Sequence, residues 1–166
     1  MILIGGGSRS GKSAAALTML RAAGPRMGFI ATAQAWDDEM RDRIALHQAE
    51  RGPEITTWED SLAVSDRIAA EEHRYEAIVV DCLTLWLSNL IHAGRNVETE
   101  SKRLLQVAVR SRAKVILVTN EVGCGIVPEN ALARRFRDEA GRLNQRAAEQ
   151  ASEVHWMIFG IGLRVK

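Results

Sequence analysis

A glycine-rich segment early in the sequence has a spacing suited to phosphate binding. Residues 6–13 read GGSRSGKS and match the pattern GxxxxGK[ST]. Glycines let the backbone turn so that successive N–H groups point at an anion. In such a loop Lys12 neutralises the β- and γ-phosphate oxygens of a nucleoside triphosphate, and the Ser13 hydroxyl binds Mg²⁺. The expected phosphate-binding residues are Gly6, Gly7, Ser8, Arg9, Ser10, Gly11, Lys12 and Ser13.

A carboxylate further along the chain could complete this metal site. Asp81 ends the apolar run AIVVD, as a Walker-B carboxylate does when it holds Mg²⁺ directly or through water. Aspartate is also a favoured N-cap, so Asp81 could cap the helix that follows. The two roles are compatible. We expect Mg²⁺ at Ser13 and Asp81, with GTP or ATP as substrate and no tightly bound organic cofactor.

The third group with potential chemistry is a histidine on a predicted helix. Met40, Ile44 and His47 fall at i, i+4 and i+7, which places His47 at the edge of an apolar stripe. Arg43 and Arg51 lie one helical turn to either side of it. Two guanidinium groups would disfavour protonation of the imidazole and could also grip phosphates. From the pattern alone a satisfied residue at the edge of the core is the commoner outcome, and a catalytic role stays open.

These groups need a scaffold, and short apolar runs alternating with helical patterns supply one. The alternation is typical of βαβ units with a mainly parallel sheet. The expected strands lie at residues 2–4, 28–32, 77–81 and 114–119, with a closing hairpin from 153–160 and 163–165. The expected helices lie at residues 12–23, 36–50, 60–72, 83–93, 97–110 and 128–150. The glycine-rich segment therefore follows a strand and opens a helix, the context that distinguishes a true P-loop from a chance match.

Composition limits the class of protein. The 166 residues are 46% hydrophobic and 26% charged, which predicts one globular domain over residues 1–166. A formal net charge of +1 argues against a nucleic-acid partner, and no apolar run approaches the roughly 20 residues that span a bilayer. Cys82 and Cys124 form no metal-binding pattern, which favours a reducing, cytoplasmic setting. We expect an α/β, three-layer fold of the P-loop NTPase type with a C-terminal hairpin.

Among P-loop proteins, the length favours a small-molecule kinase or nucleotidyltransferase. The NKxD and DxxG patterns of GTPase switches are absent: Asp81 is followed by Cys-Leu-Thr, and Asn120 by Glu-Val-Gly. A kinase for some small alcohol, with a structural His47, is one possibility. A nucleotide-dependent regulatory protein without turnover is another.

Longer segments are similar to one family along essentially the whole chain. They are, in order, GGGSRSGKS, IATAQAWDDEM, RIALHQAER, VDCLTLWLSNL, VTNEVGCGIVPEN and RRFRDEAGRLNQRAAEQASEV. They resemble the bifunctional adenosylcobinamide kinase / adenosylcobinamide-phosphate guanylyltransferase. The resemblance implies that ATP or GTP first phosphorylates the aminopropanol hydroxyl of adenosylcobinamide. GTP then donates GMP through a covalent histidine intermediate, giving adenosylcobinamide-GDP and pyrophosphate.

The resemblance also implies site residues. It places the guanylylated histidine at His47, where a neutral imidazole would attack the α-phosphorus. It implies nucleotide contacts by Ala31, Thr32, Ala33, Gln48, Ala49, Glu50, Arg51, Glu59 and Asp81. For residues 48–51 and Glu59 the alternatives are a solvated helix end and an ordinary first-turn glutamate.

The resemblance further suggests a homotrimer with active sites near subunit contacts. The loop around Cys124, between Gly123 and Gly125, is interpreted as a substrate loop. On the last long helix Arg135 and Arg142 could meet the corrinoid phosphate. Alternatively, residues 134, 138 and 142 would form a plain i, i+4 ladder of Arg, Asp and Arg.

Overall fold

The fold is seen in a computed structural model that describes residues 1–35 and 37–166, and of Arg43 the backbone alone. The expected start of a helix at residue 36 therefore lies outside the described residues. Within them the strands are β1 (Ile2–Gly6), β2 (Met27–Ala31), β3 (Ile55–Glu59), β4 (Ala77–Asp81), β5 (Lys114–Val118), β6 (Glu153–Ile158) and β7 (Ile161–Arg164). The helices there are α1 (Lys12–Arg21), α2 (Asp38–Arg51), α3 (Val64–Glu71), α4 (Leu83–His92), α5 (Val97–Arg110) and α6 (Ala131–Gln150).

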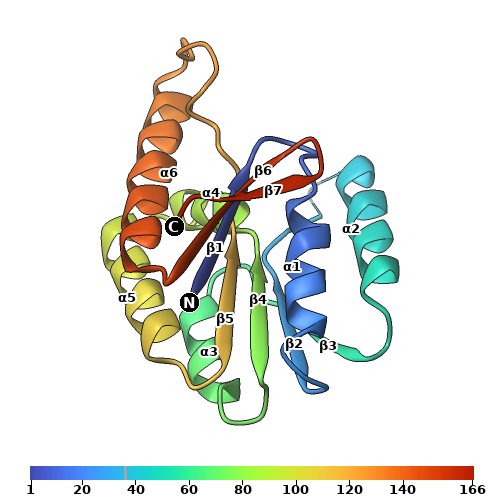
Figure 1. The fold of residues 1–166 in the computed structure, drawn as a ribbon. Helices are drawn as coiled ribbons and strands as arrows, with labels where there is room; N and C mark the ends of the chain where they lie inside the picture. The colour runs from blue at the N-terminus through green and yellow to red at the C-terminus, as the bar shows by residue number, and fades with distance from the viewer. Residues whose placement is uncertain (36) are drawn as a thin grey trace.

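All these strands form one sheet in the order β3-β2-β4-β5-β1-β6-β7. Every neighbouring pair is parallel except β6 and β7, which form an antiparallel hairpin. The four strands expected to share one parallel sheet do so, and the expected hairpin is present. Helices cover both faces, so the molecule has three layers (Figure 1).

Alternate residues of the strands supply two apolar cores, one on each face of the sheet. On one face Leu3 of β1 packs into a cluster with α3, α4, α5 and α6, in which Trp86 and Leu104 are fully buried. On the other face Ile2 and Ile4 pack against α1. This packing holds α1 against β1 and thereby fixes the position of the loop that joins them.

The largest differences from the expectations are one additional strand and the starts of two helices. Strand β3, an edge strand, falls in a segment where no strand was expected, because its sequence ITTWE mixes polar and apolar residues and it is only partly buried. Helix α3 begins at Val64 rather than near residue 60, since the Asp60 N–H continues the sheet by donating to the Ala31 carbonyl. Helix α6 begins at Ala131 rather than at residue 128, because the side chain of Asn130 caps it.

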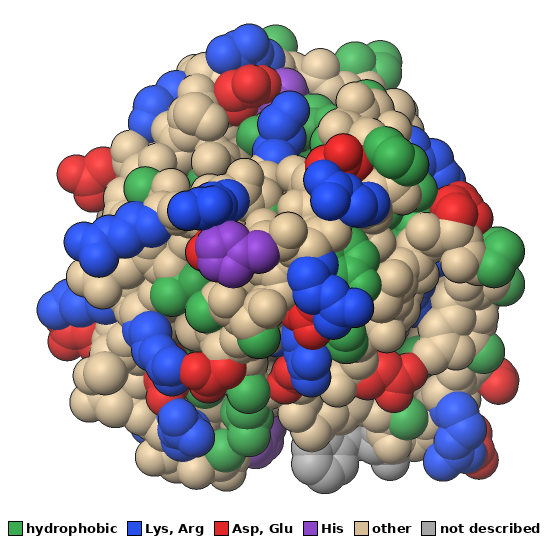
Figure 2. Space-filling view, turned by 90° about the horizontal axis from the view of Figure 1, so that it is seen from below, with side chains coloured by type: hydrophobic (Ala, Val, Ile, Leu, Met, Phe, Trp, Pro, Cys, Tyr) green, Lys and Arg blue, Asp and Glu red, His purple; other side chains and the backbone are tan. Residues whose placement is uncertain are grey.

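The surface carries charges of both signs. Figure 2 shows basic and acidic side chains interspersed on the face at the lower end of the sheet in Figure 1, in keeping with a net charge of +1. None of the helices in the described part of the chain combines the length and apolar character needed to cross a bilayer.

Candidate active site

The loop between β1 and α1 has the backbone of a phosphate cradle. Gly6 and Gly11 both have positive φ angles, 152° and 95°. A Cβ atom would lie 2.6 Å from the Met157 carbonyl oxygen at Gly6 and 3.1 Å from the Gly160 Cα at Gly11. Only glycine fits both the angles and the contacts. The loop is therefore held against the β6–β7 hairpin, and it opens directly into the N-terminus of α1, where backbone N–H groups favour an anion.

Lys12 is folded back onto this loop. Its Nζ donates to the Gly7 carbonyl at 2.5 Å and lies 3.4 Å from the Ser10 hydroxyl. Burial lowers the pKa of Lys12, and the nearby Cys82 and Asp81 only partly oppose this. A buried ammonium group forms stronger hydrogen bonds to ionised phosphate oxygens than to neutral acceptors such as the Gly7 carbonyl and the Ser10 hydroxyl.

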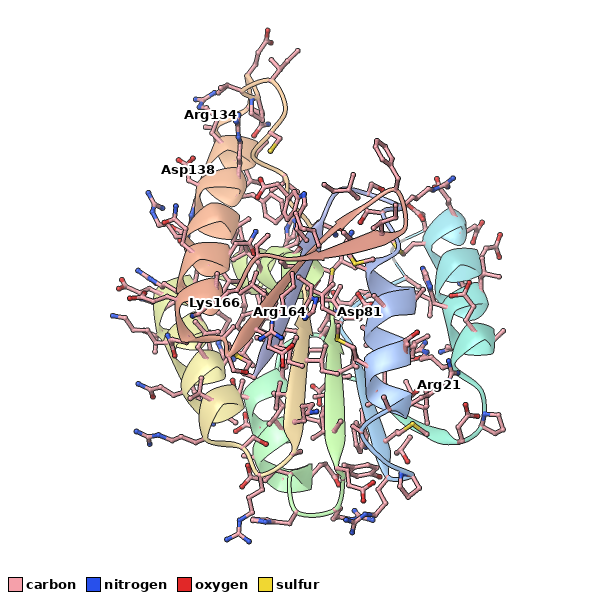
Figure 3. All side chains as sticks on the ribbon, viewed as in Figure 1. Arg21, Asp81, Arg134, Asp138, Arg164 and Lys166 are labelled. Carbon is pink, nitrogen blue, oxygen red and sulfur yellow. The ribbon has the colours of Figure 1, made fainter. Side chains whose placement is uncertain are left out.

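Asp81 stands at the end of β4, near the centre of the molecule in Figure 3. Burial raises the pKa of Asp81, and hydrogen bonding to the Ser13 hydroxyl is the largest effect that opposes the rise. Mg²⁺ prefers oxygen ligands and is usually bound by one or two protein groups together with substrate phosphates. The Ser13 hydroxyl and the Asp81 carboxylate fit this description, and a cation beside them would favour the ionised carboxylate. Within residues 1–35 and 37–166 no group of three or more His, Cys, Asp or Glu side chains forms a metal cluster.

The alternative role of Asp81 as a helix cap is wrong. The N-cap of α4 is Cys82, whose sulfur accepts from the Leu85 N–H at 3.5 Å. Burial also raises the pKa of the Cys82 thiol to about 11, so this cysteine stays protonated near neutral pH. The carboxylate of Asp81 is thus left to face the loop.

A cavity of about 580 Å³ brings most of the expected residues together. Its lining includes Ser8, Arg9, Ser10, Gly11, Lys12, Ser13, Ala31, Ala33, His47, Glu50, Arg51, Glu59 and Asp81. The P-loop, the end of β4 and helix α2 thereby share one space, although they are far apart in the sequence.

The remaining expected residues lie outside this lining. Gly6 is the last residue of β1, and Gly7 is the first residue of the loop. Thr32 is fully buried, and its hydroxyl donates to the Cys82 carbonyl at 2.8 Å. The Gln48 amide donates to Glu59 Oε1 at 2.5 Å. Gln48 lines a second cavity of about 480 Å³, which shares Ala33, Ile44 and Glu59 with the first. Ala49 is exposed and lines neither cavity.

His47 lies on α2 with its side chain 49% exposed. Its Nδ1 is 3.1 Å from Oε2 of Glu50, so a carboxylate is the neighbour of the ring. Of the two guanidinium groups expected to flank the ring, that of Arg51 packs elsewhere. Arg51 is buried, its guanidinium lies 4.5 Å from the centre of the Phe29 ring, and its Nε donates to the His47 carbonyl at 2.9 Å. The side chain of Arg43 lies outside the described residues.

Helix α2 is attached mainly at its C-terminal end. Of its described side chains only Arg51 is buried; the others are partly or fully exposed. Arg21, at the lower end of α1 in Figure 3, donates to the Arg51 carbonyl at 3.1 Å and to Glu54 Oε1 at 3.2 Å. The N-terminal part of α2 covers the cavity with Met40 and Ile44 rather than packing into a core.

Several lining residues were not predicted from the sequence. They are Ala14, Met40, Ile44, Phe29, Cys82, Leu85, Asn120, Glu121 and Val122. The last three follow β5 directly, and the carboxyl ends of parallel strands are where open α/β sheets bind ligands. That rule would have selected them, because β5 was correctly expected.

The order of strand, glycine-rich loop, helix and acidic strand end around one cavity defines a P-loop nucleotide-binding protein. Solved structures agree on the fold. A solved ATPase domain superposes with a TM-score of 0.52 at 14% identity, covering 93% of this chain and 68% of that one. The RadB recombinase gives a TM-score of 0.55 at 16% identity, covering 93% and 72%. The expected P-loop NTPase-type fold is confirmed.

Sequence comparison is more specific. A model of the family cobinamide kinase / cobinamide phosphate guanyltransferase matches residues 2–165. The bifunctional adenosylcobalamin biosynthesis protein CobU of Salmonella typhimurium is 42% identical over 181 residues, covering 100% of this chain and 99% of the relative. The CobP protein of the same description from Pseudomonas aeruginosa is 40% identical over 166 residues, covering 99% and 96%. The chain belongs to the cobinamide kinase / cobinamide phosphate guanyltransferase family, a family of bifunctional enzymes of cobalamin biosynthesis.

Proposed function

We propose that this enzyme transfers the γ-phosphate of ATP or GTP to the aminopropanol hydroxyl of adenosylcobinamide, and then transfers GMP from GTP through a covalent adduct on His47. The observation that carries the proposal is the shared cavity, in which the imidazole and the P-loop line the same space. One bound nucleotide would thus present its γ-phosphorus to an alcohol or its α-phosphorus to the histidine.

The contact with Glu50 suits His47 to nucleophilic attack. An ionised carboxylate only accepts hydrogen bonds, so the 3.1 Å contact assigns the hydrogen to Nδ1 of the ring. The lone pair is then on Nε2, which becomes the attacking atom. Orientation of an imidazole by a carboxylate is the arrangement that activates histidine in many catalytic sites. Formation of the adduct splits one difficult transfer into two easier ones.

The P-loop would serve both reactions. Lys12 would exchange its contacts with Gly7 and Ser10 for phosphate oxygens. Ser13 and Asp81 would hold Mg²⁺, which neutralises phosphate charge when it is bound. Ala31, Ala33, Glu50, Arg51 and Glu59, which line the same cavity, would contact the rest of the nucleotide.

Helix α2 would move during the guanylyl transfer. It is attached at Arg51 while its other described side chains are partly or fully exposed, so closure over the cavity costs little packing. Such closure brings the imidazole in line with the α-phosphorus and excludes water from the adduct.

The proposal extends to the setting of the enzyme. Two free cysteines, Cys82 and Cys124, suit a reducing cytoplasm. Exposed apolar side chains on the hairpin, among them Phe159 at 94% and Ile161 at 72%, suit burial against further copies in a homotrimer. Light scattering of the purified protein measures the number of subunits.

Labelled GTP tests the covalent step. Incubation with Mg²⁺ and GTP labelled at the α-phosphate is expected to leave label on the protein, stable in alkali and lost in acid, as a phosphoramidate is. GTP labelled at the γ-phosphate is the matched control and leaves none. His47→Asn abolishes the labelling but still phosphorylates adenosylcobinamide. If the protein is a kinase without the intermediate, or a regulatory binding protein, the wild type will carry no label. Label on the His47→Asn variant would contradict the assignment of His47 as the residue that carries GMP.

A further inference from the structure

A carboxylate lines the cavity on the side away from α2. Glu121 follows β5, which lies between β4 and β1 in the sheet, whereas α2 connects β2 to β3. The Glu121 N–H donates to the Gly6 carbonyl at 3.0 Å, which places the residue beside the start of the P-loop. In a P-loop the terminal phosphate of the nucleotide is held at the loop and its lysine. Glu121 therefore stands at the end of the cavity where the γ-phosphate would lie.

The side chain of Glu121 is held in place by its own loop. One carboxylate oxygen, Oε1, accepts a hydrogen bond from the Gly123 N–H. A Cβ atom on residue 123 would lie 2.6 Å from that oxygen, so glycine is needed at this position if the carboxylate is to stay where it is. The Gly123 carbonyl in turn accepts from Arg137 of α6. Among the described residues Oε2 of Glu121 accepts no hydrogen bond.

The other carboxylates of the cavity have different partners. Glu50 contacts the ring of His47, Glu59 accepts from the Gln48 amide, and Asp81 faces the Ser13 hydroxyl. Glu50 and Glu59 are thus engaged with residues of α2, and Asp81 with the proposed Mg²⁺ ligand Ser13. Glu121 differs from them in position: it lies beside the start of the P-loop, and its Oε2 is available to a second substrate there.

The two proposed transfers differ in the acceptor. The first acceptor is an alcohol, which must lose a proton as its oxygen bonds to phosphorus. The second is a phosphate ester, whose oxygens are already ionised near neutral pH. Only the first reaction needs a base close to the γ-phosphate.

We propose that Glu121 is the general base of the kinase reaction; this rests on the proposed function. As the acceptor oxygen bonds to the γ-phosphorus, its proton passes to Oε2 of Glu121. The bond from the γ-phosphorus to the bridging oxygen breaks at the same time, and the nucleoside diphosphate leaves. Guanylyl transfer does not use this residue.

The test is Glu121→Gln in the full chain. Glutamine keeps an oxygen that can accept from the Gly123 N–H but cannot take a proton. We expect kcat for phosphorylation of adenosylcobinamide to fall by roughly 10²- to 10⁴-fold. The rate of labelling by α-labelled GTP, and the transfer of that label to adenosylcobinamide phosphate, should stay within about threefold of wild type. The matched control is Glu129→Gln, an exposed carboxylate of the same loop that lies outside the cavity lining.

Other outcomes would overturn the assignment. If Glu121→Gln phosphorylates at the wild-type rate, or loses both transfers equally, the carboxylate has only a structural role. Gly123→Ala provides a second variant, because its Cβ displaces the carboxylate without removing it, and it should lose the kinase activity selectively too. If the wild-type protein does not phosphorylate adenosylcobinamide, the proposed function itself is refuted. If the wild type is active and Glu121→Gln is equally active, only the role of Glu121 is refuted.

Discussion

At the proposed phosphate-binding loop, we expect the charge of Lys12 to have opposite effects on stability with and without nucleotide. Burial lowers the pKa of Lys12, so the unfolded chain binds this proton more tightly than the folded protein does. In the nucleotide-free protein the charge therefore opposes folding near neutral pH. The unfavourable contribution of Lys12 to the free energy of folding disappears as the pH rises from the lowered pKa of Lys12 in the folded protein to its ordinary pKa in the unfolded chain. Phosphate oxygens of a bound nucleotide would reverse this effect, because they would pair with the ammonium group.

Replacing this charge separates catalysis from stability. We expect Lys12→Met to slow both γ-phosphate transfer and adduct formation on the order of 10²-fold or more, as loss of one preorganised electrostatic contact does. The melting temperature of the nucleotide-free variant should be equal to that of wild type or higher. Labelled-nucleotide assays and thermal unfolding measure the two effects. Wild-type turnover in either reaction would contradict the idea of a shared cradle.

Residues of the candidate site could be predicted from the sequence where one short segment of the chain determines their position. The P-loop is one local segment, and Asp81 ends an unmistakable apolar strand. The contact between His47 and Glu50 depends on a choice of side-chain rotamers within α2. The stacking of Arg51 on Phe29 depends on how α2 sits against β2. Neither is encoded in a local spacing, which is why the guanidinium group of Arg51 was expected beside the imidazole instead.

At the scale of elements, α2 owes its position to a few polar contacts at its C-terminal end. Arg21 of α1 reaches the Arg51 carbonyl and the side chain of Glu54. The ion pair alone is worth little because both side chains are largely exposed, at 45% and 46%. The bond to a helix carbonyl matters more here, since it fixes the end about which α2 would move.

Loss of this attachment should affect one reaction more than the other. We expect Arg21→Ala to slow adduct formation on His47 by about tenfold, the effect of losing a charged hydrogen bond, while γ-phosphate transfer changes by less than about threefold. Single-turnover labelling with α-labelled GTP measures the first rate. Arg103→Ala is the matched control, because Arg103 of α5 forms a similar exposed pair with Asp66 of α3, between two other helices. Equal slowing of both reactions would show that Arg21 supports the fold rather than the position of α2.

Buried strands and helices were easier to predict from the sequence than exposed ones. The central strands β1, β4 and β5 are continuous apolar runs covered on both faces, and each lies within two residues of its expected bounds. The edge strand β3 is partly exposed and was missed. On α6 the expected ladder of residues 134, 138 and 142 is wrong: Arg142 pairs with Glu139, and Arg134 donates to the Pro128 carbonyl. Long side chains on exposed helices choose among several partners of nearly equal energy.

At the scale of the whole molecule, the hairpin connects the sheet edge to the phosphate site. Strand β6 runs parallel to β1, and the Gly160 N–H at the hairpin turn donates to the Ser10 carbonyl at 3.0 Å. The turn is formed by Phe159 and Gly160, which have φ angles of 51° and 82°. The geometry of the P-loop is therefore set partly by a segment far away in the sequence.

A pair of matched glycine variants tests this connection. Gly160 and Gly94 both have positive φ angles, 82° and 65°, and a Cβ would meet nothing within 4 Å at either site. Gly160→Ala and Gly94→Ala should each cost about 1–2 kcal/mol of stability, the cost of a left-handed residue with a Cβ. Only Gly160→Ala should also raise the Kd for nucleotide, by about tenfold, the effect of roughly one hydrogen bond. Calorimetry measures both quantities, and an unchanged Kd for Gly160→Ala would exclude a role for the turn in binding.

The pairing of β6 with β1 also has a consequence for biosynthesis. During translation the P-loop leaves the ribosome early, whereas residues 153–164 follow long after it. Until they arrive, β1 lacks one of its two neighbours, and the Ser10 carbonyl lacks the Gly160 N–H. A nascent chain therefore has no complete phosphate cradle. Nucleotide capture should begin only once the hairpin has closed, so that an unfinished chain is spared from sequestering GTP or modifying its own histidine.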